Sequence, residues 1–425
     1  MNDTLEIGGI PALEIVDCYG TPLFVYDSDT ITRQYTRLKS AFDVPDFQIH
    51  YACKALSNIN ILKLFHHLGA KIDAVSIEEI RLCLLAGYKP EDILFTPNSV
   101  GIEEYEKGLE IGVRINIDNI ETLEYFGHHF PDQPVGIRIN PHIMAGGHQK
   151  ISVGHIDSKF GISVHQLPLV RKILDAFNVP LDGIHMHTGS DILDVQVFLS
   201  AADILFGVGR GFPELKYLNF GSGFKVKYRD SDIETDIEDF GRKMSRKFNR
   251  FCEEIGHPVT LMFEPGKFLV SESGYFLVRT NLIKQTSSTL FAGVNSGFNH
   301  LIRPMFYDAY HEILNISNPD GTPRIYTIVG YICETDTFGW NRKIPEIRVG
   351  DILALKNAGA YAFMMASNYN SRLLPAEVLV HEGKHYLIRE RQQFEDLIRH
   401  QTEPDIPFKG QVESLLARSI EETKK

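Results

Sequence analysis

The sequence lacks any long uninterrupted apolar run, so we expect no transmembrane helix. No stretch of the 425 residues approaches the ~18 consecutive apolar residues that a transmembrane helix needs. Asp3, Glu6 and Glu14 interrupt the N-terminal segment, which therefore has neither the charged region nor the apolar region of a signal peptide. We expect a cytoplasmic protein that has no membrane partner.

Cysteine is scarce, and its spacing shows no pairing. The chain has five cysteines, and no two of them form a CxxC motif. An odd number of widely spaced cysteines is not typical of a disulfide framework or of a cysteine-based zinc site. We expect reduced thiols at Cys18, Cys53, Cys83, Cys252 and Cys333.

Positive charge is in deficit as well. The chain has 43 Lys and Arg residues against 55 Asp and Glu residues, so its formal net charge is −12, and no basic stripe stands out. An acidic surface does not attract a nucleic acid or an anionic membrane, because both carry negative charge. We therefore expect no nucleic-acid partner. The remaining composition, 43% hydrophobic and 23% charged, is typical of a globular protein.

The chain does contain a regular alternation of strands and helices between residues 45 and 270. Eight short apolar runs alternate with amphipathic stretches such as 77–86, 164–177 and 233–254. Eight strand–helix units in about 220 residues predict an α/β fold built on a (β/α)8 TIM barrel, although an open doubly wound sheet shows the same alternation. The predicted strands are 47–55, 71–76, 92–98, 113–119, 134–141, 182–190, 215–223 and 259–266.

After Gly266 the pattern changes to strands with few helices between them. We expect a hairpin over 377–390 that turns at Glu382–Gly383, and further strands over 275–286, 290–295, 324–333 and 351–357. The segment 21–27 also has the pattern of a strand. The predicted domains are N-terminal strands over 1–30 that join the β domain, a barrel over 31–275, and a mainly β domain over 276–425 with a terminal helix near 411–422.

Polar residues gather where the predicted barrel strands end, and barrel enzymes have their active sites at these ends. Lys54 ends the first strand. A lysine in this position usually reaches solvent or pairs with a carboxylate, but a desolvated lysine can form a Schiff base. His185 and His187 end the sixth strand and share one face of it.

The last two barrel strands end in glycine-containing motifs, Gly221-Ser222-Gly223 and Glu264-Pro265-Gly266-Lys267. Closely spaced glycines let backbone N–H groups approach a phosphate, although such a segment is often only a turn. One cavity would then hold an amine, a stackable imidazole, a phosphate cradle and a carboxylate. Together these groups are what pyridoxal 5'-phosphate requires.

At these residues the sequence resembles the fold-type III pyridoxal-phosphate decarboxylases, and within them the diaminopimelate decarboxylases. The likeness covers nearly the whole chain. It rests on TPLFVYD (21–27), YACKA (51–55), DAVSIEE (73–79), SKFGI (158–162), HMHTGS (185–190), NFGSGF (219–224), EPGK (264–267), LIRPMFYDAYH (301–311), GYICET (330–335), NAGAYAFMMASNYNSR (357–372) and PAEVLV (375–380).

The resemblance implies a fold, an activity and a partner. The family pairs an alanine-racemase-like barrel with a C-terminal β domain, and it forms a homodimer whose active sites lie at the interface. The implied enzyme is a carboxy-lyase that uses pyridoxal 5'-phosphate to convert meso-2,6-diaminopimelate to L-lysine and CO2, the last step of lysine biosynthesis.

The resemblance also implies roles for individual residues. Lys54 matches the lysine that bonds to the cofactor, and Cys333 matches the acid that returns a proton to the α-carbon, so these are the candidate catalytic residues. Cys333 and Glu334 match a pair donated across the dimer. The implied cofactor contacts are Lys54, His187, Ser190, Gly221, Gly223, Glu264, Gly266 and Tyr361, and the implied substrate contacts are Lys267, Arg303, Tyr307, Glu334 and Tyr361.

Several departures from the family pattern leave the substrate open. Lys267 replaces the arginine of an EPGR motif, Leu56 and Asn295 replace an asparagine and an aspartate, and the segment after Cys333 differs from CESGD. Because a lysine cannot bind a carboxylate bidentately, a related decarboxylase of ornithine, arginine or a carboxylated polyamine remains an alternative.

Two alternatives come from other classes of protein. A pyridoxal-phosphate carrier without activity would resemble a lone barrel, whereas this chain also has a β-rich part. A zinc hydrolase could use His185 and His187, but we find no convincing further ligands at the other strand ends, so we expect no metal.

Cys333 itself ends an apolar run, where a buried and inert cysteine is the usual finding.

Overall fold

The computed structural model describes residues 5–142, 158–187, 189, 192–229, 231–402 and 404. The chain divides into two compact units, Met1–Arg391 and Gln392–Lys425. The second unit contains α12 (Phe394–Ile398), and the helix predicted near 411–422 lies outside the described residues. Within the described ranges, no helix is long and apolar enough to cross a membrane.

Eight parallel strands close into a barrel in the first unit. β12 pairs back onto β4, with Leu261 opposite Phe47, and this pairing closes the ring. The TIM-barrel prediction is confirmed, because each predicted strand coincides with one barrel strand. In order around the barrel these are β4 (Phe47–Ala52), β5 (Lys71–Ala74), β6 (Ile93–Phe95), β7 (Arg114–Ile117), β8 (Val135–Asn140), β10 (Leu181–Met186), β11 (Tyr217–Asn219) and β12 (Thr260–Phe263). A short strand, β9 (Ile162–Ser163), pairs with β8.

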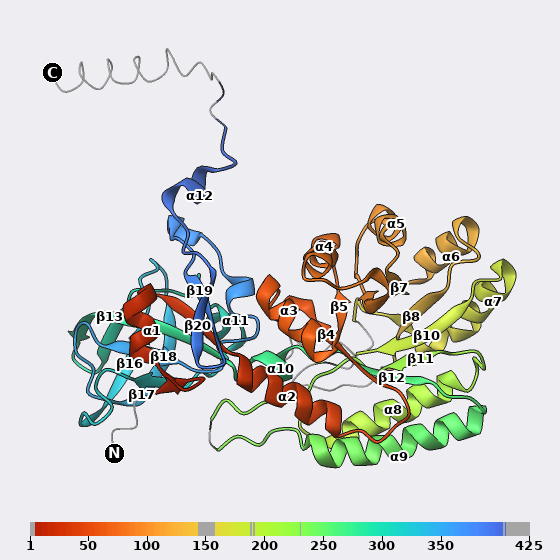
Figure 1. Cartoon of the computed structure of the whole chain (residues 1–425), viewed down its shortest axis with the longest axis horizontal. Helices are drawn as coiled ribbons and strands as arrows, with labels where there is room; N and C mark the ends of the chain where they lie inside the picture. The colour runs from red at the N-terminus through yellow and green to blue at the C-terminus, as the bar shows by residue number, and fades with distance from the viewer. Residues whose placement is uncertain are drawn as a thin grey trace. The chain divides into compact units, whose positions relative to one another are not determined.

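Helices surround the barrel strands, as Figure 1 shows for α4 to α9. Most of them begin at a side chain that caps the first turn: Ser76 Oγ accepts from Glu79 N, and Asp236 Oδ1 accepts from Asp239 N. The cap at Asp236 makes the helix predicted from residue 233 begin at residue 237. The helices are α2 (Ser28–Ser40), α3 (Ile59–Leu68), α4 (Ile77–Leu85), α5 (Ile102–Ile111), α6 (Ile120–His129), α7 (Leu167–Phe177), α8 (Val195–Gly209) and α9 (Ile237–Ile255).

A second sheet joins strands from both ends of the first unit. β3 (Leu23–Asp27) pairs antiparallel with β13 (Gly274–Gln285) and parallel with β19 (Ala376–His381). The other strands of this sheet are β14 (Leu290–Val294), β15 (Ile313–Asn315), β16 (Pro323–Val329), β17 (Thr337–Pro345), β18 (Ile352–Leu355) and β20 (Lys384–Arg389). The chain is therefore α/β, with a barrel and a separate mainly β sheet.

The N-terminal segment and one strand end differ from the sequence prediction. Residues 12–19 form a helix, α1, where only strands were expected; it follows a small hairpin of β1 (Glu6–Ile7) and β2 (Ile10–Pro11). The strand predicted over 324–333 ends at Val329. The hairpin at 377–390 is confirmed, and its turn residues Glu382 (φ 50°) and Gly383 (φ 68°) both have the positive φ that a type I′ turn requires.

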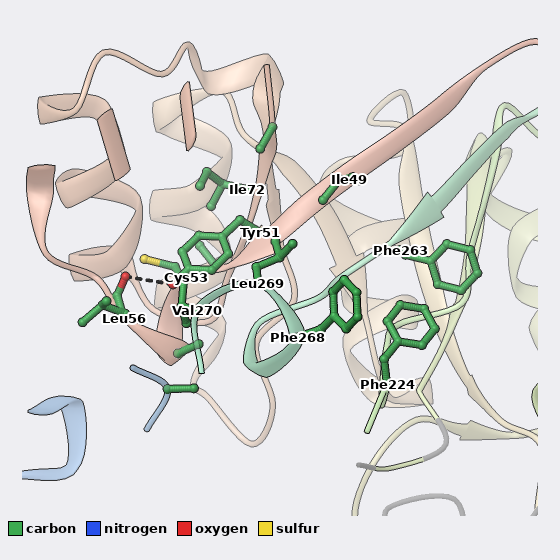
Figure 2. Close-up of a cluster of buried hydrophobic side chains, with 14 of the residues drawn as sticks. Ile49, Tyr51, Cys53, Leu56, Ile72, Phe224, Phe263, Phe268, Leu269 and Val270 are labelled. Atoms are coloured by element: carbon green, nitrogen blue, oxygen red, sulfur yellow. Dashed lines mark hydrogen bonds between the residues drawn. The ribbon is translucent and has the colours of Figure 1, made fainter. Parts of the chain in front are cut away.

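Hydrophobic packing fixes the end of β4, which carries Lys54. The Tyr51 ring stacks on Phe65 with 3.9 Å between ring centroids, and its hydroxyl donates to the Leu56 carbonyl at 3.0 Å. Figure 2 shows Tyr51, Cys53 and Leu56 together in this cluster. Because its neighbours on both sides are buried, the backbone of Lys54 is held in place at the mouth of the barrel.

Candidate active site

A cavity of about 390 Å³ opens where the barrel strands end, a volume typical of small-molecule sites. Its lining contains seven of the predicted site residues: Lys54, His187, Gly223, Glu264, Gly266, Lys267 and Tyr361. Ala52, Val75, Thr96, Asn98, Arg138, Lys159, Phe160, His185, Ser222, Phe224 and Phe268 complete the lining. Ser190 lies outside the described residues.

Lys54 pairs with a buried carboxylate on the neighbouring strand. Its Nζ lies 3.3 Å from Asp73 Oδ2 at the end of β5, while the hydroxyl of Thr96 donates to the other oxygen of Asp73. Burial alone would lower the pKa of Lys54, but the charges of Asp73 and Glu264 outweigh it and raise that pKa above its usual range. Asp73 thus keeps Lys54 as an ammonium aimed into the cavity.

Glu264 follows β12 and lies between two polar side chains. Asn219 Nδ2 donates to its Oε1 at 2.6 Å, and His185 Nε2 lies 3.2 Å from its Oε2. Burial would raise the pKa of Glu264, but the charges of His185 and Lys54 hold it well below its usual range. Glu264 is therefore a buried carboxylate that stays ionised.

His187 is a neutral imidazole in the same cavity. Its Nδ1 accepts a hydrogen bond from the backbone N–H of Ser222 at 3.2 Å, which places its ring proton on Nε2. Burial lowers the pKa of His187 to about 3, and the nearby charge of Arg138 adds to the effect. An uncharged ring beside the cavity is suited to stacking on a planar ligand.

Three predicted glycines have backbone positions that a side chain could not share. A Cβ at Gly223 (φ +136°) would lie 2.4 Å from the carbonyl oxygen of Gly189, and one at Gly266 would lie 2.9 Å from Ala55 Cβ. Gly223 and Gly266 line the cavity, but Gly221 does not. The N–H of Gly221 instead donates to Asn219 Oδ1, and its carbonyl accepts from Glu264 N at 2.7 Å.

Tyr361 has a strained backbone that brings the β domain to the cavity. Its φ is +55°, a region that bulky side chains rarely adopt. Its N–H donates to the carbonyl of Ala55 at 2.9 Å, directly after Lys54. Strain of this kind is typical of functional sites, and here it places the phenol ring in the lining.

Sequence reasoning missed several residues of this cavity. Asp73, Thr96 and Asn219 support Lys54 and Glu264. Arg138, at the end of β8, is buried in the lining, with its guanidinium 4.7 Å from the Phe160 ring centroid. Each of these residues is a polar side chain within a predicted apolar strand. This pattern could have identified them as candidate site residues.

Arg303 does not line this cavity. It begins α11 (Arg303–Tyr307), is buried, and its Nη2 donates to the hydroxyl of Tyr228 at 3.0 Å. In the described part of the chain, its Nε has no hydrogen-bond partner and no carboxylate lies within ion-pair distance of it. A buried guanidinium without a counter-charge is suited to binding an anion.

Cys333 and Glu334 also lie away from the cavity lining, and both side chains are exposed. Asn370 Nδ2 donates to Cys333 Sγ at 3.3 Å, and the hydroxyl of Tyr369 donates to Glu334. The buried thiol that is usual at the end of an apolar run is therefore not found.

The site fits the cofactor and gives no support to a zinc centre. It offers an amine at Lys54, a neutral ring at His187, an ionised Glu264, and a cradle at Gly223 and Gly266 that any Cβ would fill. Among the described residues, no group of three or more His, Cys, Asp or Glu side chains could hold a metal ion. His185 instead contacts Glu264 and Asn116.

Comparison with known proteins shows which family the chain belongs to. The family model "Pyridoxal-dependent decarboxylase, pyridoxal binding domain" matches residues 28–271. A diaminopimelate decarboxylase of Methanothermobacter thermautotrophicus is 40% identical, and the match covers 94% of this chain and 96% of that protein. The chain belongs to the diaminopimelate decarboxylase family. Membership makes it a pyridoxal-phosphate-dependent carboxy-lyase.

Solved structures of diaminopimelate decarboxylases share the fold over nearly their whole length. The enzyme from Methanocaldococcus jannaschii in complex with L-lysine superposes with a TM-score of 0.86 at 31% identity, over 95% of this chain and 98% of that one. The enzyme from Helicobacter pylori complexed with L-lysine gives a TM-score of 0.84 at 30% identity, over 91% and 98%.

Proposed function

We propose that the protein removes one carboxylate of meso-2,6-diaminopimelate to yield L-lysine and CO2, the last step of lysine biosynthesis. The observation that carries the proposal is the cavity in which Lys54, His187 and Glu264 meet a glycine cradle, in a chain whose relatives are named for this activity. When bound, pyridoxal phosphate supplies an electron sink for the carbanion that loss of CO2 leaves.

The residues that would hold the cofactor each have one task. The Lys54 amine would bond to it, and His187 would lie against its ring. Glu264 would face the ring nitrogen, where an ionised carboxylate keeps a proton in place. Gly223, Gly266 and Tyr361 would contact the phosphate. Gly221 would lie beside them as a further cofactor contact, and its hydrogen bonds also support Glu264 and Asn219.

Asp73 pairs with the Lys54 ammonium before reaction. Burial raises the pKa of Asp73, and the charge of Glu264 raises it further. Since Asp73 Oδ2 lies 3.3 Å from Nζ, it is placed to accept a proton from the ammonium and to orient the free amine. Thr96 keeps the carboxylate in this orientation through its own hydrogen bond.

Substrate recognition rests on Arg303, Tyr307 and Lys267 in this proposal. Arg303 is buried without a carboxylate partner among the described residues, so a substrate carboxylate would complete its hydrogen bonds. Lys267 follows the cradle and lines the cavity. Its ammonium can attract a carboxylate as a point charge, although it cannot form a bidentate contact.

We also propose that the protein is a homodimer in which Cys333 and Glu334 act in the partner's cavity. Both residues are exposed and neither lines the cavity of its own chain. Cys333 would return the proton to the α-carbon after CO2 has left, and Glu334 would bind the distal ammonium of the substrate. Because the pair does not line the cavity of its own chain, a second copy would bring it to the substrate.

The remaining sequence predictions belong to the same proposal. We propose N-terminal strands over 1–30 that join the β domain, a barrel over 31–275 and a mainly β domain over 276–425. Pairing of β3 with β13 and β19 supports the first of these. The net charge of −12 supports a protein without a nucleic-acid partner. A cytoplasmic location also stays a proposal.

A substrate panel tests the proposed function. Purified protein loaded with pyridoxal phosphate would be incubated separately with meso-diaminopimelate, ornithine, arginine and a carboxylated polyamine, and the amine products would be separated by chromatography. We expect lysine from meso-diaminopimelate and at least ~100-fold slower turnover of the others, because only diaminopimelate carries both a carboxylate for Arg303 and an ammonium for Glu334 at its distal end. Absence of lysine would overturn the proposal.

A further inference from the structure

Two adjacent residues hold the proposed cross-subunit pair. Asn370 contacts Cys333 with both ends of its amide: Nδ2 donates to Sγ at 3.3 Å, and Oδ1 lies 3.8 Å from Sγ. The neighbouring hydroxyl of Tyr369 donates to Glu334. Each member of the 333–334 pair therefore has its own partner in the segment 369–370.

The backbone at Asn370 is held in an unusual conformation. Asn370 (φ +57°) and Ser371 (φ +55°) are consecutive left-handed residues in the short 3-10 segment 369–371. A left-handed conformation is unfavourable for a non-glycine residue, although Asn tolerates it better than most. Two such residues in a row need support from their surroundings.

Neighbouring contacts supply that support. The Tyr369 ring stacks on Phe298 with 5.8 Å between centroids. Two hydrogen bonds join Asn299 and Ser367: the N–H of Ser367 donates to the Asn299 carbonyl at 2.8 Å, and Asn299 Nδ2 donates to the Ser367 carbonyl. The segment is thus fastened directly before the residue whose amide faces Cys333.

We propose that Asn370 is a positioning residue that orients the sulfur of Cys333 for proton transfer and supports it after the proton has left. The inference rests on the proposed function, in which Cys333 is the acid. In the resting state Oδ1 of Asn370, 3.8 Å from Sγ, is placed to accept from the thiol, and the Nδ2 donor faces the sulfur.

The geometry matches what proton transfer requires at the sulfur. The S–H bond of Cys333 breaks, its electron pair stays on sulfur, and a new C–H bond forms with the pair that loss of CO2 left on the α-carbon. The sulfur then carries a negative charge. A donor already placed at 3.3 Å stabilises this charge more than the neutral thiol.

The experiment compares Asn370→Asp with wild type. Aspartate keeps the size and the left-handed backbone but replaces the donor with a negative oxygen. Iodoacetamide labelling of Cys333 would be followed by peptide mass spectrometry, with the exposed Cys18 as internal reference. We expect labelling of Cys333 relative to Cys18 to slow about tenfold, and kcat to fall about tenfold while KM changes less than about twofold.

Two further variants make the result decisive. Asn370→Gly removes the amide without straining φ and should lower kcat similarly. Asn341→Gly is the matched control, because Asn341 is also a left-handed asparagine (φ +49°) and none of its observed hydrogen bonds involves Cys333. It should leave both rates unchanged.

The outcomes separate this inference from the proposed function. Unchanged labelling of Cys333 in Asn370→Asp overturns the inference, whether or not kcat falls. Slower labelling with unchanged kcat overturns it as well, since the sulfur orientation would then not matter for turnover. Failure of the wild-type enzyme to form lysine overturns the proposed function instead, and labelling still reports on the contact.

Discussion

His185 Nε2 and Glu264 Oε2 lie 3.2 Å apart, and both side chains are buried in the wall of the cavity. Burying a carboxylate is expensive unless nearby groups compensate, and the amide of Asn219 adds a hydrogen bond on the other oxygen. The result is a negative charge fixed in position where the ring of the cofactor would lie, so its removal should affect catalysis directly.

Glu264→Gln should abolish most of the activity without unfolding the protein. Glutamine keeps the hydrogen bond with Asn219 but removes the negative charge that the cofactor ring nitrogen requires. We expect kcat to fall at least ~100-fold, with cofactor absorbance retained. Steady-state kinetics and an absorbance titration measure the two effects. Glu382→Gln, at the exposed hairpin turn, is the control, and a kcat loss below about threefold at Glu264 would contradict the assignment.

Gly223→Ala should weaken cofactor binding more than it weakens the fold. The new Cβ would lie 2.4 Å from the Gly189 carbonyl oxygen, in the lining of the cavity. Gly256→Ala is the matched control, because Gly256 also has a positive φ (+82°) but open space around its Cβ. We expect Kd for pyridoxal phosphate to rise at least ~10-fold in Gly223→Ala only, measured by absorbance titration. Equal effects of the two variants would argue against the cradle.

Tyr228→Phe should raise KM for the substrate. The Tyr228 hydroxyl accepts a hydrogen bond from Arg303 and also lies 3.2 Å from Ser271 Oγ. Without it, the guanidinium loses a fixed orientation, worth roughly 1 kcal/mol, or about fivefold in KM. Turnover at saturation should change less. The control is Tyr386→Phe, on the exposed strand β20, which should leave KM unchanged. If KM were also unchanged in Tyr228→Phe, the proposal that Arg303 binds the substrate would be contradicted.

Asp336 should make the stability of the protein fall as the pH rises from about 4 to about 6. Burial raises the pKa of Asp336 from 3.8 to about 6, although the N–H groups of Phe298 and Ile332 donate to it. The folded state therefore binds this proton more tightly than the unfolded state. The stabilising contribution of the protonated form is complete below the unfolded value and is lost as the pH passes through the folded one.

Asp336→Asn removes this titration and provides the comparison. The stability of wild type relative to Asp336→Asn should decline by up to about 3 kcal/mol between pH 4 and pH 7, as measured by urea unfolding. Parallel stability curves for the two proteins would refute the prediction. Asp336 accepts a hydrogen bond from the loop that carries Cys333 and Glu334. The Asp336 carboxylate therefore holds the proposed cross-subunit pair, although its ionisation lowers the stability of the fold at neutral pH.

The barrel could be predicted because its strands are buried on both faces. Such strands appear as continuous apolar runs, and their ends show where polar residues begin. The same property made the predicted strands too long: Lys54 and His187 lie just beyond β4 and β10. β17 was not predicted, because its nine residues contain exposed polar positions that interrupt the pattern.

The candidate site was only partly predictable for a related reason. Lys54, His187 and Glu264 each follow a strand and are visible in the sequence as polar residues at the ends of apolar runs. The contact of Asn219 with Glu264 and the contact of Asp73 with Lys54 both depend on pairing between strands that are far apart in the chain. The exposure of Cys333 likewise depends on where β16 ends. The sequence did not reveal this end, because the apolar run continues beyond it.

The pairing of β3 has a practical consequence for dissecting the protein. β3 precedes the barrel but lies between β13 and β19 in the second sheet. No single cut in the chain can therefore separate an intact barrel from an intact sheet. A truncated chain that ends before residue 376 would leave one edge of β3 unpaired and open to aggregation, whereas removal of the barrel requires two cuts and a linker that rejoins β3 to β13.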